Sequence, residues 1–156
     1  MPLVQQQRPQ VTARPGDAGG RPVMLATLDV PFDPNAVAFA VDSAVELGQR
    51  LIVANFVEQE PLPLSASMGY DDLPYPPELA ESLAEPVRLA LSLGVAVTRL
   101  RVKSFRPVQA MVEVVAEENA GLLVFGPDRA RIRRLRYRWA ARTIRARVTA
   151  LIWLAE

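Results

Sequence analysis

The chain has 156 residues, of which 50% are hydrophobic, 22% charged and 6% aromatic. This length fits one domain with a buried core of its own. The chain contains no cysteine and no histidine, which excludes disulfide frameworks, thiol nucleophiles, most zinc sites and every Ser-His-Asp triad. Lys103 is the single lysine and no Gly-Lys-Ser/Thr sequence is present, so a P-loop is excluded as well.

The charges are unevenly distributed along the chain. The formal net charge is +1, yet residues 129–156 hold nine arginines against one acidic residue. No apolar run approaches 18 residues, and the N-terminus lacks the basic-then-apolar arrangement of a secretory signal. We therefore expect no membrane span and a cytoplasmic protein.

The first half of the chain alternates strand and helix patterns. Residues 1–20, with three consecutive glutamines and repeated proline and glycine, predict a disordered tail ahead of a folded domain at 21–156. The apolar run Pro22–Asp29 is typical of a central parallel strand that is buried on both faces. Asp33 and Pro34 predict the cap and first residue of a helix that ends at Gly48. A second strand is predicted for Leu51–Val57.

The alternation continues after a Pro-rich loop predicted for residues 59–77. The later predicted elements are a helix over Leu79–Leu91, a strand over Val95–Val102, a helix from Pro107 to before Gly121, a strand over Leu122–Gly126, a basic helix at 133–147 and a strand over Thr149–Leu154. Strands that alternate with helices in this way predict an α/β fold, a doubly wound five-stranded parallel sheet with right-handed crossovers.

The order of these segments resembles the universal stress protein family, whose members share a doubly wound, Rossmann-like sheet and often bind ATP. The resemblance covers residues 21–156. Two segments are similar to features of the family: Val23–Asp29 to its first strand, which ends in Asp, and Arg106–Met111 to its Asp-Pro-x-x-x-Ile helix start. The other segments that carry the resemblance are Leu51–Glu58, Gly94–Val97 and Ala120–Gly126.

The ATP-binding members of that family carry a glycine signature after the fourth strand: Gly, two residues, Gly, nine residues, Gly, then Ser or Thr. Glycine lets a backbone approach phosphate closely, and peptide N–H groups then donate to it. Gly126 occupies the first position, but Arg129 occupies the second, and Trp139 and Ala140, or Tyr137 and Arg138 in a shorter alignment, occupy the last two. The resemblance therefore implies a domain that has lost the usual ATP motif.

Candidate ligand-binding residues lie at the carboxyl ends of the predicted strands. Asp29 matches the family residue that contacts nucleotide, and it could instead close the turn before Pro31 or pair with an arginine. Phe56 would lie beside a base if one binds, and it could instead belong to the core. Gly126, Arg129 and Arg138 complete the candidate site. Asp29 and Asp33 have no third ligand near them in the sequence, so we expect no metal site.

The arginine segment leaves three interpretations open. We expect Arg131, Arg134, Arg138, Arg142 and Arg145 on one helix face, beside a buried stripe of Ile132, Leu135, Trp139 and Thr143. The arginines could grip a small anionic ligand, could bind an acidic macromolecule, or could be a solvated face that pairs with acidic residues of the chain or of a second copy. An acidic protein is the partner class that we favour, and nucleic acid is not expected.

The sequence contains no catalytic constellation, because its serines lie in no nucleophile-elbow context. We expect a non-enzyme: a binding or signalling domain that forms homodimers through the apolar edge strand Thr149–Leu154. No cofactor is expected, and ATP is the one candidate. The alternative is a nucleotide-sensing domain for ATP or AMP in which arginines near the fourth strand hold the phosphate.

Overall fold

The parallel sheet predicted from the sequence is confirmed. A computed structural model describes residues 5–6, 10–12, 20–60 and 75–156. Its central strands run parallel in the order β5-β4-β3-β6-β7. They are β3 (Val23–Thr27), β4 (Leu51–Glu58), β5 (Val97–Ser104), β6 (Leu122–Phe125) and β7 (Leu151–Leu154).

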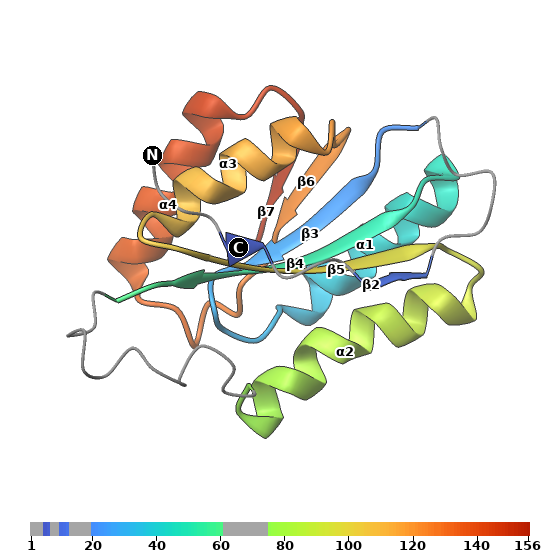
Figure 1. Cartoon of the computed structure of the whole chain (residues 1–156), viewed down its shortest axis with the longest axis horizontal. Coiled ribbons are helices and arrows are strands. Elements are labelled where there is room, and N and C mark those ends of the chain that lie inside the picture. The colour runs from blue at the N-terminus through green and yellow to red at the C-terminus, as the bar shows by residue number, and fades with distance from the viewer. Residues whose placement is uncertain (1–4, 7–9, 13–19, 61–74) are drawn as a thin grey trace.

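Two pairs of helices cover the two faces of the sheet (Figure 1). The helices α1 (Pro34–Leu47) and α2 (Pro77–Ser92) pack on one face, and α3 (Pro107–Glu117) and α4 (Arg134–Arg147) pack on the other. Side chains alternate between the faces, so Leu25 belongs to the α1–α2 core and its neighbour Met24 to the α3–α4 core. As predicted, β3 is buried along its whole length.

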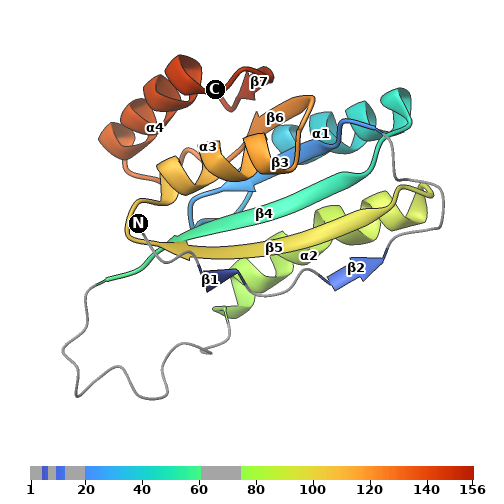
Figure 2. The same cartoon turned by 45° about the horizontal axis from the view of Figure 1, so that its top comes forward.

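Two short strands that the sequence analysis did not predict lie along the outer edge of β5 (Figure 2). These are β1 (Gln5–Gln6) and β2 (Gln10–Thr12), and both pair with β5 in the antiparallel sense. The rest of the predicted tail before Gly20, and residues 61–74 of the predicted loop, lie outside the described residues. The outer edge of β5 is thus paired, whereas that of β7 has no partner strand in the described part of the chain.

The helix α4 is rotated relative to the prediction. Ile132 is buried as expected, but Leu135 is 78% exposed and Trp139 is 59% exposed, so the predicted buried stripe is wrong at both positions. The buried face consists of Tyr137, Ala140, Ala141 and Ile144. The two alanines let α4 approach the sheet closely, and the ring of Tyr137 stacks on Phe125 of β6. The larger side chains are therefore left on the outward face.

Candidate functional site

The candidate site lies where the strand order reverses, at the carboxyl ends of β3 and β6. The chain runs from β3 outward to β4 and β5, then returns to β6 and β7 on the other side of β3. Open parallel sheets bind ligands at such a switch point. The two segments that follow these strands are joined there, because the N–H of Asp33 donates to the Gly126 carbonyl at 2.9 Å and the N–H of Asp128 to the Pro31 carbonyl at 2.8 Å.

Asp29 follows β3 in a left-handed backbone conformation with φ 57°. Such a φ is uncommon for a residue other than glycine, and the side chain of Asn55, which pairs with the last residue of β3 in the β3–β4 register, supports it. The Asn55 Oδ1 accepts from the Asp29 N–H at 2.8 Å, and the Asn55 Nδ2 donates to the Asp29 carboxylate at 3.4 Å. Asp29 forms no ion pair with an arginine among the described residues. Asp29 is an exposed residue at the carboxyl end of β3.

We expect the free energy of unfolding of the Asn55→Ala variant to be about 1–3 kcal/mol lower than that of the parent chain, because the partly buried Asp29 N–H loses its acceptor. Urea denaturation measures this difference. Asn35→Ala is the matched control, since Asn35 is an exposed residue in the first turn of α1. Equal stabilities of the two variants would contradict the supporting role of Asn55.

Tyr75 and Arg101 lie beside Asn55 on the α2 side of this edge. The Arg101 guanidinium lies 4.2 Å from the centre of the Tyr75 ring, and Arg101 pairs with Asn55 in the β4–β5 register. Burial raises the pKa of the Tyr75 phenol above its ordinary value of 10.0, and the nearby Asn55 and Arg101 oppose the rise. The sequence analysis did not select Tyr75, Asn55 or Arg101. The one signal that the sequence offered for these residues was the amide residue Asn55, which directly follows the apolar run at the start of β4.

The raised pKa of Tyr75 predicts a loss of stability in alkaline solution. Above about pH 10 the unfolded chain releases the Tyr75 proton while the folded chain retains it, so this contribution to stability is present below that pH and declines as pH rises through the folded pKa. We expect Tyr75→Phe to lose less thermal stability than the parent between about pH 9 and about pH 11. Parallel losses in the two proteins would show that Tyr75 titrates normally.

Gly126 directly follows β6 and lies in close contact with α1. A Cβ atom at this position would overlap the Cβ of Ala36, and Leu25 is the next neighbour. Its backbone does not lie in the left-handed region. The structure therefore explains this glycine by helix packing, whereas the sequence analysis had assigned it to the path of a phosphate.

The backbone N–H groups of Gly126 and of the loop between it and α4 donate to acceptors within the protein. The N–H of Gly126 donates to the Ala26 carbonyl at 3.0 Å, and those of Arg131 and Ile132 donate to the Asp128 carbonyl at 3.0 and 3.1 Å. The N–H of Ala130 donates to the Asp128 carboxylate at 3.0 Å. These donors resemble the set that a phosphate-binding loop would direct at its ligand, and here each one has an acceptor within the protein.

The arginines predicted for the site point in different directions. The Arg129 guanidinium stacks at 3.6 Å from the centre of the Tyr137 ring and donates to the Ala155 carbonyl at 3.4 Å, which also accepts from the Tyr137 hydroxyl. Arg138 is exposed on α4. The structure thus does not bring these two arginines together around one ligand position.

Arg131 crosses the carboxyl edge and forms an ion pair with Glu78 at the start of α2. Both side chains are largely exposed, so the pair contributes no more than about 1 kcal/mol to stability. The pair joins the loop after β6 to the start of α2, and the two residues are too far apart in the sequence for the sequence analysis to have predicted their contact.

Phe56 is fully buried in the core between the sheet and the α3–α4 layer. Its ring exposes no surface at which a base could stack, so the core interpretation agrees with its placement. Within residues 5–6, 10–12, 20–60 and 75–156, no group of three or more acidic side chains could hold a metal ion. None of the helices described there is long and apolar enough to cross a membrane.

Comparisons with known proteins identify the family. The profile of the Universal stress protein family matches residues 20–147. The structure of a universal stress protein from Archaeoglobus fulgidus is 18% identical, covers 88% of this chain and 94% of its own, and superposes with a TM-score of 0.61. A search of curated proteins finds no match.

Two further solved structures share the fold. The universal stress protein from Archaeoglobus fulgidus in complex with dAMP is 17% identical, with coverage of 88% and 98% and a TM-score of 0.59. A universal stress protein in complex with cAMP is 19% identical, with coverage of 87% and 96% and a TM-score of 0.57. Because this profile spans most of the chain, the chain belongs to the universal stress protein family.

Proposed function

We propose that this chain is a non-catalytic binding domain of the universal stress protein family that forms homodimers and does not hold ATP in the manner of the ATP-binding members. The observation that carries the proposal is the loop after β6. Its N–H groups at Gly126, Arg131 and Ile132 donate to backbone carbonyls, and that of Ala130 donates to the Asp128 carboxylate. A triphosphate would have to replace these hydrogen bonds, because each donor already has a partner.

Arg129 supports the same proposal. It occupies the second glycine position of the family signature, and its guanidinium stacks on Tyr137 and donates toward the C-terminal strand. To reach a phosphate, this side chain would have to leave the aromatic ring, at a cost of about 0.5–2 kcal/mol in lost cation–π interaction. The Asp29 carboxylate is likewise engaged by Asn55.

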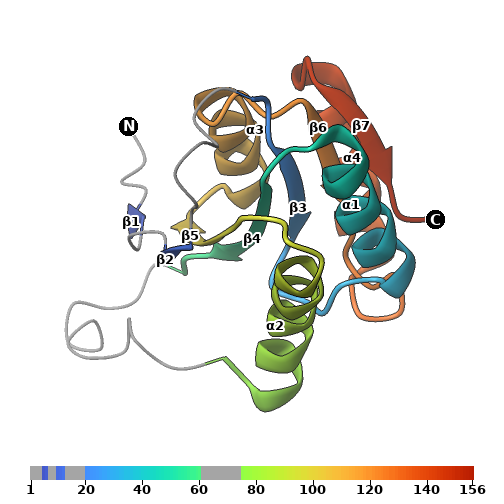
Figure 3. The same cartoon turned by 90° about the vertical axis from the view of Figure 1, so that its right-hand side faces the viewer.

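The open edge of β7 supports homodimer formation. The helix α1 lies beside β7 (Figure 3), and the ring of Phe39 on α1 stacks on Trp153 at 5.2 Å between centroids. Leu151, which faces the same side of the sheet, is 75% exposed. An unpaired strand flanked by exposed apolar side chains favours pairing with a second copy around a two-fold axis. We propose the cytoplasm as the location of this dimer.

A second candidate function is nucleotide sensing, and one observation favours it. The start of α4 has no side-chain cap, and the exposed Arg133 and Arg134 add positive charge next to the first N–H groups of this helix. The solved relatives with dAMP and cAMP are consistent with a nucleotide of this class. Because the Arg131–Glu78 ion pair is weak, a phosphate could replace the Glu78 carboxylate.

Thermal unfolding with AMP, cAMP and ATP separates the two candidates. We expect no rise in the melting temperature at ligand concentrations of about 1 mM, and no absorbance of a bound base in the purified protein. A rise that Arg131→Ala abolishes would establish nucleotide sensing instead. Arg88→Ala is the matched control, because Arg88 also forms an exposed ion pair with a residue of α2, Glu81.

A further inference from the structure

A groove lies on the outer face of the α3–α4 layer, away from the crevice at the switch point. Its volume is about 540 Å³, and its walls come from the start of α3 and from the middle and end of α4. The polar and aromatic side chains that line it are those of Arg106, Gln109, Trp139, Arg142, Thr143 and Arg147. A volume of this size accommodates one nucleotide or a group of similar bulk.

The groove is strongly cationic. It is lined by three arginines and by no carboxylate. In the described part of the chain, ion pairs form at Arg50, Arg88 and Arg131, and none forms at an arginine of α4. The nearest acidic group on α3 is Glu113, which accepts from the Gln109 amide at 3.5 Å. Among the described residues, the arginines that line this groove therefore form no ion pair with an acidic side chain.

Trp139 places an aromatic plane in this cationic groove. The indole is 59% exposed although the helix that carries it has a separate buried face. An exposed tryptophan between arginines combines a surface on which a base can stack with donors that bind the attached phosphate. An acidic peptide would use the arginines alone, and a flat lipid surface would not need a concave wall with the amide of Gln109 and the hydroxyl of Thr143.

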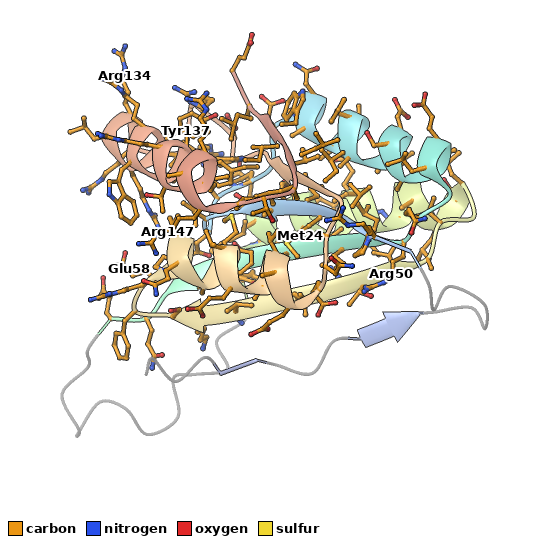
Figure 4. The ribbon with its side chains drawn as sticks, turned by 90° about the horizontal axis from the view of Figure 1, so that it is seen from above. Met24, Arg50, Glu58, Arg134, Tyr137 and Arg147 are labelled. Atoms are coloured by element: carbon orange, nitrogen blue, oxygen red, sulfur yellow. The ribbon has the colours of Figure 1, made fainter. Side chains whose placement is uncertain are left out.

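The basic surface continues beyond the groove. Arg134, Arg138 and Arg145 are exposed along α4, and Arg134 points away from the body of the molecule (Figure 4). Arg147 lies at the other end of this helix, so cationic side chains follow it over its full length. A free nucleotide would leave these positions unused, whereas a strand of several nucleotides would present a phosphate to each in turn.

We propose that this groove binds single-stranded nucleic acid, with Trp139 stacking on a base and Arg106, Arg142 and Arg147 contacting the backbone phosphates. Double-stranded nucleic acid is disfavoured, because its bases are stacked on each other and expose no face to Trp139. The sequence analysis did not expect a nucleic acid partner, and it placed Trp139 in the buried stripe of the helix. The outward rotation of α4 is the observation that changes this expectation.

Fluorescence anisotropy of a labelled 12-nucleotide oligo-dT tests the proposal with the full chain. We expect Trp139→Ala to weaken binding roughly tenfold. We expect Arg142→Ala to weaken binding as well, and its affinity should depend less steeply on salt concentration than that of the parent chain. Both side chains are exposed, so the variants should keep the parent circular dichroism and melting temperature. Arg88→Ala and Leu93→Ala, an exposed arginine and an exposed leucine of the α1–α2 face, should bind like the parent.

Three competitors identify the ligand class. Poly-glutamate carries repeated charge without bases, free dTMP carries a base and one phosphate, and a duplex carries stacked bases. We expect none of them to displace the oligonucleotide at equal phosphate or carboxylate concentration. In a Trp153→Phe background, Trp139 is the single tryptophan, and we expect oligo-dT to quench its fluorescence.

Four results would overturn the proposal. They are no binding of oligo-dT at low salt, equal binding by Trp139→Ala, competition by poly-glutamate at equal charge, and displacement by dTMP as effective as by the oligonucleotide. The third would assign the surface to an acidic protein, and the fourth would assign it to a free nucleotide.

Discussion

The Leu151→Glu variant is expected to be monomeric at micromolar concentration where the parent chain is dimeric. Leu151 lies on the outermost strand and is 75% exposed, so the substitution leaves the folded protomer intact. Two copies of β7 that pair around a two-fold axis would bring Leu151, Trp153 and Phe39 of each protomer into the contact. A glutamate at position 151 would place two carboxylates in this apolar interface.

The expected effect is large because the contact is small and apolar. Several hundred Å² of buried surface contributes about 25 cal/mol per Å² before association costs are subtracted, and desolvating an unpaired charge removes this surplus. Trp153, on the same strand, is a poorer position for this test. Its ring packs on Phe39 within the protomer, so a glutamate in its place would also destabilise the fold, whereas a phenylalanine keeps an aromatic ring there.

Leu135→Glu provides the matched control. Leu135 is 78% exposed and lies on α4, away from the edge of β7, so this variant gains the same charge at similar exposure. Light scattering should report a dimer for the control and a monomer for Leu151→Glu. A monomeric parent, or a Leu151→Glu variant that remains dimeric, would place the interface elsewhere or exclude it.

The Gly126→Ala variant is expected to lose about 1–3 kcal/mol of unfolding free energy, because its new Cβ overlaps that of Ala36 in a packed region. The neighbouring atoms belong to α1 and to Leu25 in the centre of the sheet, so relief requires a shift of the helix. Chemical denaturation measures the loss.

A double substitution tests this explanation directly. Ala36→Gly removes the overlapping methyl group, so we expect Gly126→Ala with Ala36→Gly to be no less stable than Ala36→Gly alone. Ala38→Gly, at an exposed position of the same helix, controls for the cost of about 1 kcal/mol that glycine imposes in a helix. Additive losses in Gly126→Ala with Ala36→Gly would show that the glycine serves another purpose, such as approach to a ligand.

The fold could be predicted because its signals are local. The apolar run of β3 and the Asp33 cap, whose carboxylate accepts from the N–H of Asn35 and of Ala36, are each visible within a few residues. The orientation of α4 could not be predicted in this way, because this helix carries apolar side chains on two faces. Periodicity cannot decide which of the two a sheet will bury, and the closer approach that Ala140 and Ala141 permit decides it here.

The places of the candidate residues in the fold followed from the sequence, whereas their contacts did not. Asp29 and Gly126 lie at the switch point as expected, because the carboxyl ends of β3 and β6 meet there. The contacts that define their roles join residues distant in sequence. Asn55 holds the Asp29 turn, and Ala36 requires the glycine at 126. No pattern along one sequence reveals such pairs, and β1 and β2 likewise gave no signal because they are short and contain glutamines.

Isothermal titration of the purified chain with ATP tests the central claim most directly, namely that the crevice at the switch point does not hold ATP. With the loop N–H groups of Gly126, Ala130, Arg131 and Ile132 already donated within the protein, we predict a dissociation constant no tighter than about 1 mM, equivalent to about −4 kcal/mol. A micromolar dissociation constant that is weakened by Asp29→Ala would contradict it, because ATP would then occupy the crevice despite these hydrogen bonds.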